Sequence, residues 1–350
     1  MIKKNLSRTV SMELLNNEIV VKILSSLEIK KYFLAFRTSP ERMTIYYKGL
    51  IVCELIYNHH LKKTFILPRK FSNSKNNSIV KINQIYQNEL AKYYSNGKFE
   101  NIVLDNLQIF NEILIAGEKF LDSFFDTHYK NRIKEKIIQQ EIACQYQYNE
   151  DFMCVDLEYN QCFNNMAEKN SNETIKGRYD FIILKKMVAN VYKIIFVELK
   201  SNINACTDYF TGLINHKYDS IGFLDAYNNT LNNEIKRTID SGILFTVKQK
   251  LNKDIILDDT PEFAFLFNMV PEEKNKTPKT YNDIFKLIDK EIVKAKNTKS
   301  VDSINKINND KIIDNTYSKR DIDNNLKEKI YKQFSQTKCY YDDFVEIKYE

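Results

Sequence analysis

The chain has 350 residues, of which 43% are hydrophobic and 28% are charged, and its formal net charge is +6. This length suits one large domain or two smaller ones, and the hydrophobic content is enough for a proper core. The mild positive charge permits contact with phosphate groups but requires any strongly positive surface to be local.

The sequence predicts no secretory signal peptide, no membrane span and no cysteine-based metal site. The N-terminus MIKKNLSRTV lacks the apolar core of a signal peptide, and no apolar run approaches membrane-spanning length. The six cysteines form no C-x-x-C pair and have no histidine at metal-ligand spacing, which predicts free thiols in a reducing compartment. We therefore expect a cytoplasmic protein that does not contact a membrane.

An N-terminal β-rich lobe is predicted for residues 1–75. A helical pattern covers residues 11–36 and is interrupted at Ser25-Ser26. The run MTIYYKGLIVCELIYN, residues 43–58, then predicts two strands hinged at Lys48-Gly49.

This lobe is locally basic. Its candidate nucleic-acid-binding residues are Lys62, Lys63, Arg69 and Lys70. Tyrosine and phenylalanine residues are interleaved with them, and such a mixture can bind a phosphate backbone and stack on bases. The alternative is a solvated sheet face whose aromatic residues belong to the core.

Residues 76–295 are expected to form the main core together with its preceding helices. A polar loop, SNSKNNS at residues 72–78, leads into a helix from Ile79 to Tyr94 that Asn96-Gly97 would close. A second helical stretch runs from Leu104 to about Tyr146, in one piece or two.

The most informative pattern is GRYDFIILKKMVANVYKIIFVELKSN, residues 177–202. Two apolar, β-branched runs, Tyr179 to Leu184 and Tyr192 to Leu199, flank a short polar-to-mixed stretch, which predicts two adjacent strands joined as a hairpin. The second run is largely apolar on both faces, as is typical of a sheet covered by helices.

Three of the charged residues in this predicted hairpin, Asp180, Glu198 and Lys200, are candidates for one site. If the turn is centred on Ala189, Asp180 lies directly opposite Glu198, and Lys200 shares the face of Glu198. Cross-strand neighbours have Cβ atoms roughly 5 Å apart, so two carboxylates there repel each other. A divalent cation offsets that repulsion, and carboxylate oxygens are what a hard cation such as Mg²⁺ prefers.

The hairpin resembles the D…(D/E)-x-K signature of the PD-(D/E)xK nuclease superfamily, with Asp180 as the first half and Glu198-Leu199-Lys200 as the second. That superfamily includes many restriction enzymes, resolvases and nucleases of repair or defence, and its core runs helix, three strands, helix, strand. The resemblance covers residues 105–270. Tyr179 stands where the name-giving proline would be, and that proline is not a ligand.

The resemblance implies an α/β (α+β) fold with a restriction-endonuclease-like mixed sheet flanked by helices, and a nuclease that depends on Mg²⁺ or Mn²⁺. Asp180 and Glu198 would ligate one or two ions, and the main-chain carbonyl of Leu199 would be a further ligand. Lys200 would orient the attacking water or stabilise developing negative charge.

In this superfamily a glutamate from the helix before the first strand often joins the metal shell. Glu141 falls within the arc of isoleucines expected to face inward and is the candidate, while Glu135 lies toward the edge of that arc. Either could instead be an ordinary helix-surface carboxylate. The first core strand is expected at FMCVDLEYN, residues 152–160, where Asp156 and Glu158 are weaker acidic alternatives.

The remaining pattern continues the core and then becomes polar. A helix is predicted from Lys217 to Ile239 and would stop at Ser241-Gly242. ILFTVKQK at residues 243–250 and EFAFLFNMV at residues 262–270 predict strands. Residues 296–350 are expected to form a polar, partly flexible C-terminal segment.

These patterns predict a metal-dependent phosphodiesterase acting on nucleic acid, most simply DNA. Bacterial restriction or phage defence is the setting suggested by analogy, and a homodimer is left open. Two other classes stay open. One is a non-catalytic nucleic-acid-binding module on the same fold, and the other is a protein-interaction scaffold in which the three charged residues form a buried ion pair.

Overall fold

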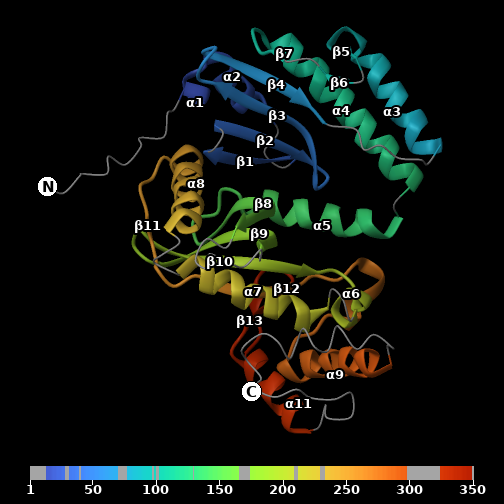
Figure 1. Ribbon diagram of the computed structural model, residues 1–350, viewed down its shortest axis with the longest axis vertical. Coiled ribbons are helices and arrows are strands. Elements are labelled where there is room, and N and C mark those ends of the chain that lie inside the picture. The colour runs from blue at the N-terminus through green and yellow to red at the C-terminus, as the bar shows by residue number, and fades with distance from the viewer. Residues whose placement is uncertain are drawn as a thin grey trace, which may run out of the picture. The chain divides into compact units, whose positions relative to one another are not determined.

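The computed structural model describes residues 13–27, 31–38, 41–69, 77–96, 98–99, 102–128, 130–164, 174–208, 212–228, 233–297 and 324–348. Over these residues the protein has a mixed α/β fold with a five-stranded, a seven-stranded and a two-stranded sheet (Figure 1). Contacts between Cα atoms divide the chain into two compact units. The first joins residues 1–157, 184–192 and 236–257, and the second joins residues 158–183, 193–235 and 258–350.

The first unit contains an antiparallel sheet with the strand order β1-β2-β3-β4-β7. Its strands are β1 (Tyr32–Thr38), β2 (Glu41–Tyr47), β3 (Leu50–Asn58), β4 (Lys63–Pro68) and β7 (Ile102–Val103). The predicted hinge is confirmed: Lys48 and Gly49 form the turn between β2 and β3, with φ angles of 48° and 74°. This left-handed backbone suits a tight hairpin.

The helical pattern predicted for residues 11–36 is only partly correct. Helices α1 (Glu13–Asn16) and α2 (Glu18–Ser26) form, and the side chain of Asn17 caps α2 by accepting from the N–H of Ile19 at 2.9 Å. Residues 32–38 form β1 instead, because this segment pairs with β2 along its whole length.

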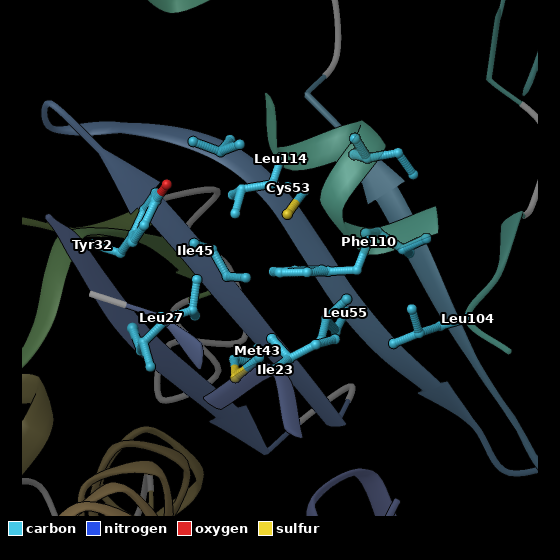
Figure 2. Packing of buried hydrophobic residues seen from close by; sticks show 14 of the residues in the cluster. Ile23, Leu27, Tyr32, Met43, Ile45, Cys53, Leu55, Leu104, Phe110 and Leu114 are labelled. Atoms are coloured by element: carbon cyan, nitrogen blue, oxygen red, sulfur yellow. The ribbon is translucent and has the colours of Figure 1, made fainter. Parts of the chain in front are cut away.

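Helices α3 (Asn77–Glu89) and α4 (Leu107–His128) belong to the same unit as this sheet. Helix α4 packs on β3 and β4, and α3 packs on α4. Figure 2 shows the resulting core, in which Phe110 of α4 points toward Ile45 of β2 and toward Cys53 and Leu55 of β3. The four side chains are fully buried, so α4 completes the core that the sheet alone would leave exposed.

The helices predicted between residues 79 and 146 form, but with different boundaries. The stretch from Leu104 to Tyr146 does form two helices, α4 and α5 (Lys130–Tyr146). Helix α3 ends at Glu89 rather than Tyr94. A single 3₁₀ turn, η1 (Ala91–Tyr93), and the short hairpin of β5 (Tyr94–Ser95) and β6 (Lys98–Phe99) follow, and Asn96 has a φ of 51° in its turn.

The seven-stranded sheet has the order β14-β13-β12-β10-β9-β8, and β11 (Ile256–Leu257) pairs in parallel with β10. Its other strands are β8 (Phe152–Asn164), β9 (Thr174–Val188), β10 (Val191–Lys200), β12 (Glu262–Phe267), β13 (Lys338–Tyr341) and β14 (Val345–Glu346). The predicted hairpin is confirmed as β9 and β10. Every side chain from Ile194 to Lys200 is buried, so both faces of β10 are covered.

The strand predicted at residues 243–250 is wrong. Helix α8 (Asn233–Leu251) runs through Ser241-Gly242 to the end of that segment. A lone glycine costs a helix only about 1 kcal/mol. Ile239, Ile243 and Val247 are buried at the i, i+4, i+8 spacing of one helix face, and this stripe outweighs the weak stop signal.

The strand that follows the helices is β12, as the apolar run at residues 262–270 predicts. It pairs in parallel with β10, from Ile195 opposite Glu262 to Lys200 opposite Phe267. Helices α6 (Ile203–Thr207), α7 (Leu213–Asn228) and α8 lie between β10 and β12 in sequence. Such helical connections are what a parallel strand pair requires.

The C-terminal segment, predicted to be polar and partly flexible, contains a helix and a buried strand. Helix α9 (Tyr281–Asn297) is followed by residues 298–323, which lie outside the described residues, as do residues 72–76 of the predicted polar loop. Helix α11 (Asn324–Ser335) then leads to β13, which pairs in parallel with β12 and buries Cys339 and Tyr340. The end of the chain thus contributes a core strand. None of the described helices combines the length and apolarity needed to cross a membrane.

Candidate functional site

The hairpin that carries the predicted site has a two-residue turn, Ala189 and Asn190. Oδ2 of Asp180 accepts a hydrogen bond of 2.7 Å from the backbone N–H of Leu199. Asp180 thus contacts the β10 backbone between Glu198 and Lys200. The expected pairing of Asp180 directly opposite Glu198 stays a prediction.

Glu198 and Lys200 form a buried ion pair on β10. The Nζ atom of Lys200 lies 3.2 Å from Oε1 of Glu198, and the two side chains are only 3% and 11% exposed, respectively. Isolated buried charges are costly, whereas a hydrogen-bonded pair offsets much of that cost. At 3% exposure, the Lys200 side chain is shielded from bulk water.

A third side chain at this ion pair, His216 of α7, was not predicted from the sequence. Its Nδ1 lies 3.2 Å from the same oxygen, Oε1 of Glu198, and its side chain is 25% exposed. Burial disfavours the charged form of Glu198. The positive charge of Lys200 and the hydrogen bond from His216 outweigh burial and hold the pKa of Glu198 below its usual value. Glu198 is thus ionised at neutral pH.

The first turn of α7 is fixed by a buried carboxyl from α9. Oε2 of Glu291 accepts a hydrogen bond of 3.2 Å from the backbone N–H of Ile214, and Glu291 is 1% exposed. Burial raises the pKa of Glu291 to about 8, although the N–H groups of α7 and the charge of Lys200 oppose the shift. Gly212 leaves room for this contact, because a Cβ there would clash with the Glu291 carboxyl.

Tyr179, at the position of the family's proline, belongs to an aromatic cluster. Its ring centroid lies 4.9 Å from that of Phe196 on β10 and 5.1 Å from that of Phe223 on α7. Its side chain is buried. These contacts join the hairpin to α7, so the tyrosine has a packing role that proline could not fill.

The glutamates predicted to complete a metal shell lie on α5, in the first unit. Glu141 is exposed rather than inward-facing, while its neighbours Gln140 and Ile142 are buried. The buried face of α5 also includes polar residues, Gln139 among them, which the isoleucine arc did not anticipate. Glu135 is half-buried. A role for either glutamate in metal binding stays a prediction.

The weaker acidic alternatives lie on β8. Asp156 is buried and its Oδ1 accepts a hydrogen bond of 2.8 Å from the N–H of Leu157, which satisfies it locally. The side chain of Glu158 lies outside the described residues.

The donors at the site bear on whether it could hold a metal ion. Among the side chains that the structure describes, no group of three or more His, Cys, Asp or Glu residues is arranged to hold a metal ion. The site does offer two carboxylates on neighbouring strands: Oδ2 of Asp180 accepts a hydrogen bond from the Leu199 N–H, and Oε1 of Glu198 lies 3.2 Å from both Lys200 Nζ and His216 Nδ1. Metal-binding carboxylates are commonly hydrogen-bonded in this way, so the donor chemistry fits a hard cation.

The predicted basic cluster is not one surface. Lys62 and Lys63 are exposed at the start of β4, whereas Arg69 follows its other end, roughly 20 Å away along six residues of strand. The Arg69 guanidinium lies 5.8 Å and 5.9 Å from the ring centroids of Phe120 and Phe124, so it packs on α4. Lys70 lies outside the described residues.

Comparisons with known proteins give no independent support for an identification. No protein-family model matches the chain, and neither does any curated protein or solved structure compared with it. Function must therefore be argued from the site itself.

Proposed function

We propose that the protein is a metal-dependent nuclease, a phosphodiesterase acting on nucleic acid and most simply on DNA. The observation that carries this proposal is the contact between the Asp180 carboxylate and the backbone of Leu199. It brings the aspartate to the part of β10 that also carries Glu198 and Lys200.

The order of elements around the site supports the same proposal. Helix α5 precedes β8, β9 and β10, which are neighbours in one sheet, and helices then lead to β12 on the other side of β10. This order of helix, three strands, helix and strand is the one that the resemblance to PD-(D/E)xK nucleases implies.

Each side chain has a role in this proposal. Asp180 and Glu198 would hold Mg²⁺ or Mn²⁺, and when bound the cation would lower the pKa of a water molecule and stabilise charge on the phosphate. Lys200, whose ammonium lies 3.2 Å from Glu198, would stabilise developing negative charge beside the carboxylate. His216 donates to the same carboxylate.

The second candidate is a scaffold or nucleic-acid-binding module in which these charges are structural. Glu198 already has two positively charged or polar partners, Lys200 and His216, and needs no cation for its burial. This reading accounts for the low exposure of Lys200. It gives the Asp180 carboxylate no role beyond its hydrogen bond with the Leu199 N–H.

Cleavage assays separate the two candidates. Purified protein is incubated with plasmid, linear duplex DNA, single-stranded DNA and RNA in Mg²⁺, in Mn²⁺ and in EDTA. We expect metal-dependent cleavage that Asp180→Asn and Glu198→Gln each abolish, with no further loss in the double variant, because ligands of one site act as a unit. Asp219→Asn, an exposed carboxylate on α7, is the matched control and should stay active.

The proposal fails if the wild type cleaves equally well in EDTA, or if it cleaves no substrate while remaining folded. Cleavage that survives in both carboxylate variants would also contradict it, because the activity would then come from another site.

A further inference from the structure

The contact between His216 and Glu198 also restricts the orientation of the Glu198 carboxylate. A carboxylate has only acceptor oxygens, so the Nδ1 of His216 is the donor in this 3.2 Å hydrogen bond. Lys200 donates to the same oxygen, Oε1, also at 3.2 Å. Two donors converging on one oxygen restrict the orientation of the carboxylate, and both of these contacts are made by Oε1 rather than Oε2.

The position of His216 is itself fixed by its helix. The backbone N–H of His216 donates to the carbonyl of Gly212 at 3.2 Å, and Glu291 of α9 holds the N–H of Ile214 two residues earlier. A buried carboxyl from a second helix therefore anchors the turn that presents the imidazole. All of these residues belong to the second unit.

We propose that His216 is a positioning residue that holds the Glu198 carboxylate so that Oε2 is available to a divalent cation. This inference rests on the proposed function, because the cation is part of it. Hydrogen bonds from outside the ligand set typically improve metal affinity about 10- to 100-fold. A histidine that only stabilised the fold would lower the unfolding midpoint when removed but would leave the metal affinity of the folded protein unchanged.

Isothermal titration with Mn²⁺ tests the proposal without using activity. We expect His216→Ala to weaken Mn²⁺ binding about 10- to 100-fold. His216→Asn should recover most of the affinity, because the Asn side-chain amide places an N–H close to the position of Nδ1. His216→Gln should not, because its longer side chain places the N–H farther from the backbone.

Two controls make the result interpretable. His60→Ala removes a histidine that is exposed on a turn of the first unit and should bind Mn²⁺ like the wild type. Glu198→Gln removes the carboxylate and should abolish binding at this site. Urea denaturation of every variant identifies those that are folded, and if His216→Ala is not folded, the comparison of His216→Asn with His216→Gln decides.

Failure of this inference is distinguishable from failure of the proposed function. Wild-type protein that binds Mn²⁺ through Glu198 with unchanged affinity in folded His216→Ala, or with equal affinity in the Asn and Gln variants, overturns the role of His216 alone. Wild-type protein that binds no Mn²⁺, or binds it equally well after Glu198→Gln, overturns both.

Discussion

The buried carboxyl of Glu291 predicts an unusual dependence of stability on pH. Glu291 is 1% exposed, and burial raises its pKa to about 8. The opposing contributions, from the N–H groups of Ile214 and Leu213 and from the charge of Lys200, are smaller. In the unfolded chain the pKa of a glutamate is about 4.3.

The direction in which the free energy of unfolding changes with pH follows from proton binding. Between about pH 4.3 and pH 8 the folded protein holds a proton on Glu291 that the unfolded chain has released, so the free energy of unfolding falls as pH rises. The stabilisation relative to an ionised group is fully present below the unfolded pKa and is lost as pH rises to the folded pKa. Each pH unit in this interval costs up to about 1.4 kcal/mol, or about 2 to 3 kcal/mol between about pH 5.5 and about pH 7.5.

Glu291→Gln removes the titrating group but keeps a side-chain oxygen that can accept from Ile214. We expect the free energy of unfolding of this variant to change much less with pH than that of the wild type. Equilibrium urea denaturation from about pH 5.5 to about pH 7.5 measures both curves, and their difference cancels the groups that the two proteins share. Glu328→Gln, an exposed carboxyl on α11, is the control and should follow the wild type.

Parallel curves for the wild type and Glu291→Gln would refute the reasoning, because they would mean that Glu291 binds no extra proton in the folded state. Two other groups, Glu198 and Lys250, also have shifted pKa values, and these affect stability mainly outside the range from about pH 5.5 to about pH 7.5. The lowered pKa of Glu198 matters only as pH falls below the usual carboxyl range. Burial lowers the pKa of Lys250 to about 8, so its effect, stability rising with pH, begins above that value.

Three further predictions concern the ion pair, the aromatic cluster and the exposed lysines. Lys200→Ala should lower the free energy of unfolding by about 3 to 5 kcal/mol in urea denaturation, because it leaves the buried charge of Glu198 without its lysine partner. A loss below about 1 kcal/mol would mean that water replaces the lysine. Tyr179→Ala should lower the free energy of unfolding by about 3 to 5 kcal/mol in the same assay, and Tyr179→Phe should lower it much less. Equal losses in the two variants would contradict the packing role of the ring. Replacing Lys62 and Lys63 with Ala, in a variant that cannot cleave, should weaken duplex DNA binding at low salt and flatten the slope of log K against log salt by up to about two units. Fluorescence anisotropy measures the slope, and an unchanged slope would exclude this surface from DNA binding.

Local patterns in the sequence were enough to predict several elements. The alternation and β-branched runs on either side of Ala189 predict the hairpin of β9 and β10, because side-chain period and turn residues are properties of adjacent residues. The turn at Lys48-Gly49 is predicted for the same reason. The acidic and basic residues of the D…E-x-K pattern are likewise visible in the sequence, on the strands where the structure places them.

The tertiary structure decided what local patterns leave ambiguous. Residues 243–250 suit a strand or a helix equally well, and only the buried face of α8 selects the helix. The hydrogen bond from the Leu199 N–H to the Asp180 carboxylate also follows from no spacing in the sequence, because it depends on how the two strands pair. Glu291 and Ile214 are 77 residues apart in the chain, and no spacing rule links them. Periodicity determines which residues share a face of one element. Packing between distant elements determines which faces meet, and that is how His216 and Glu291 come to support the carboxylate of Glu198.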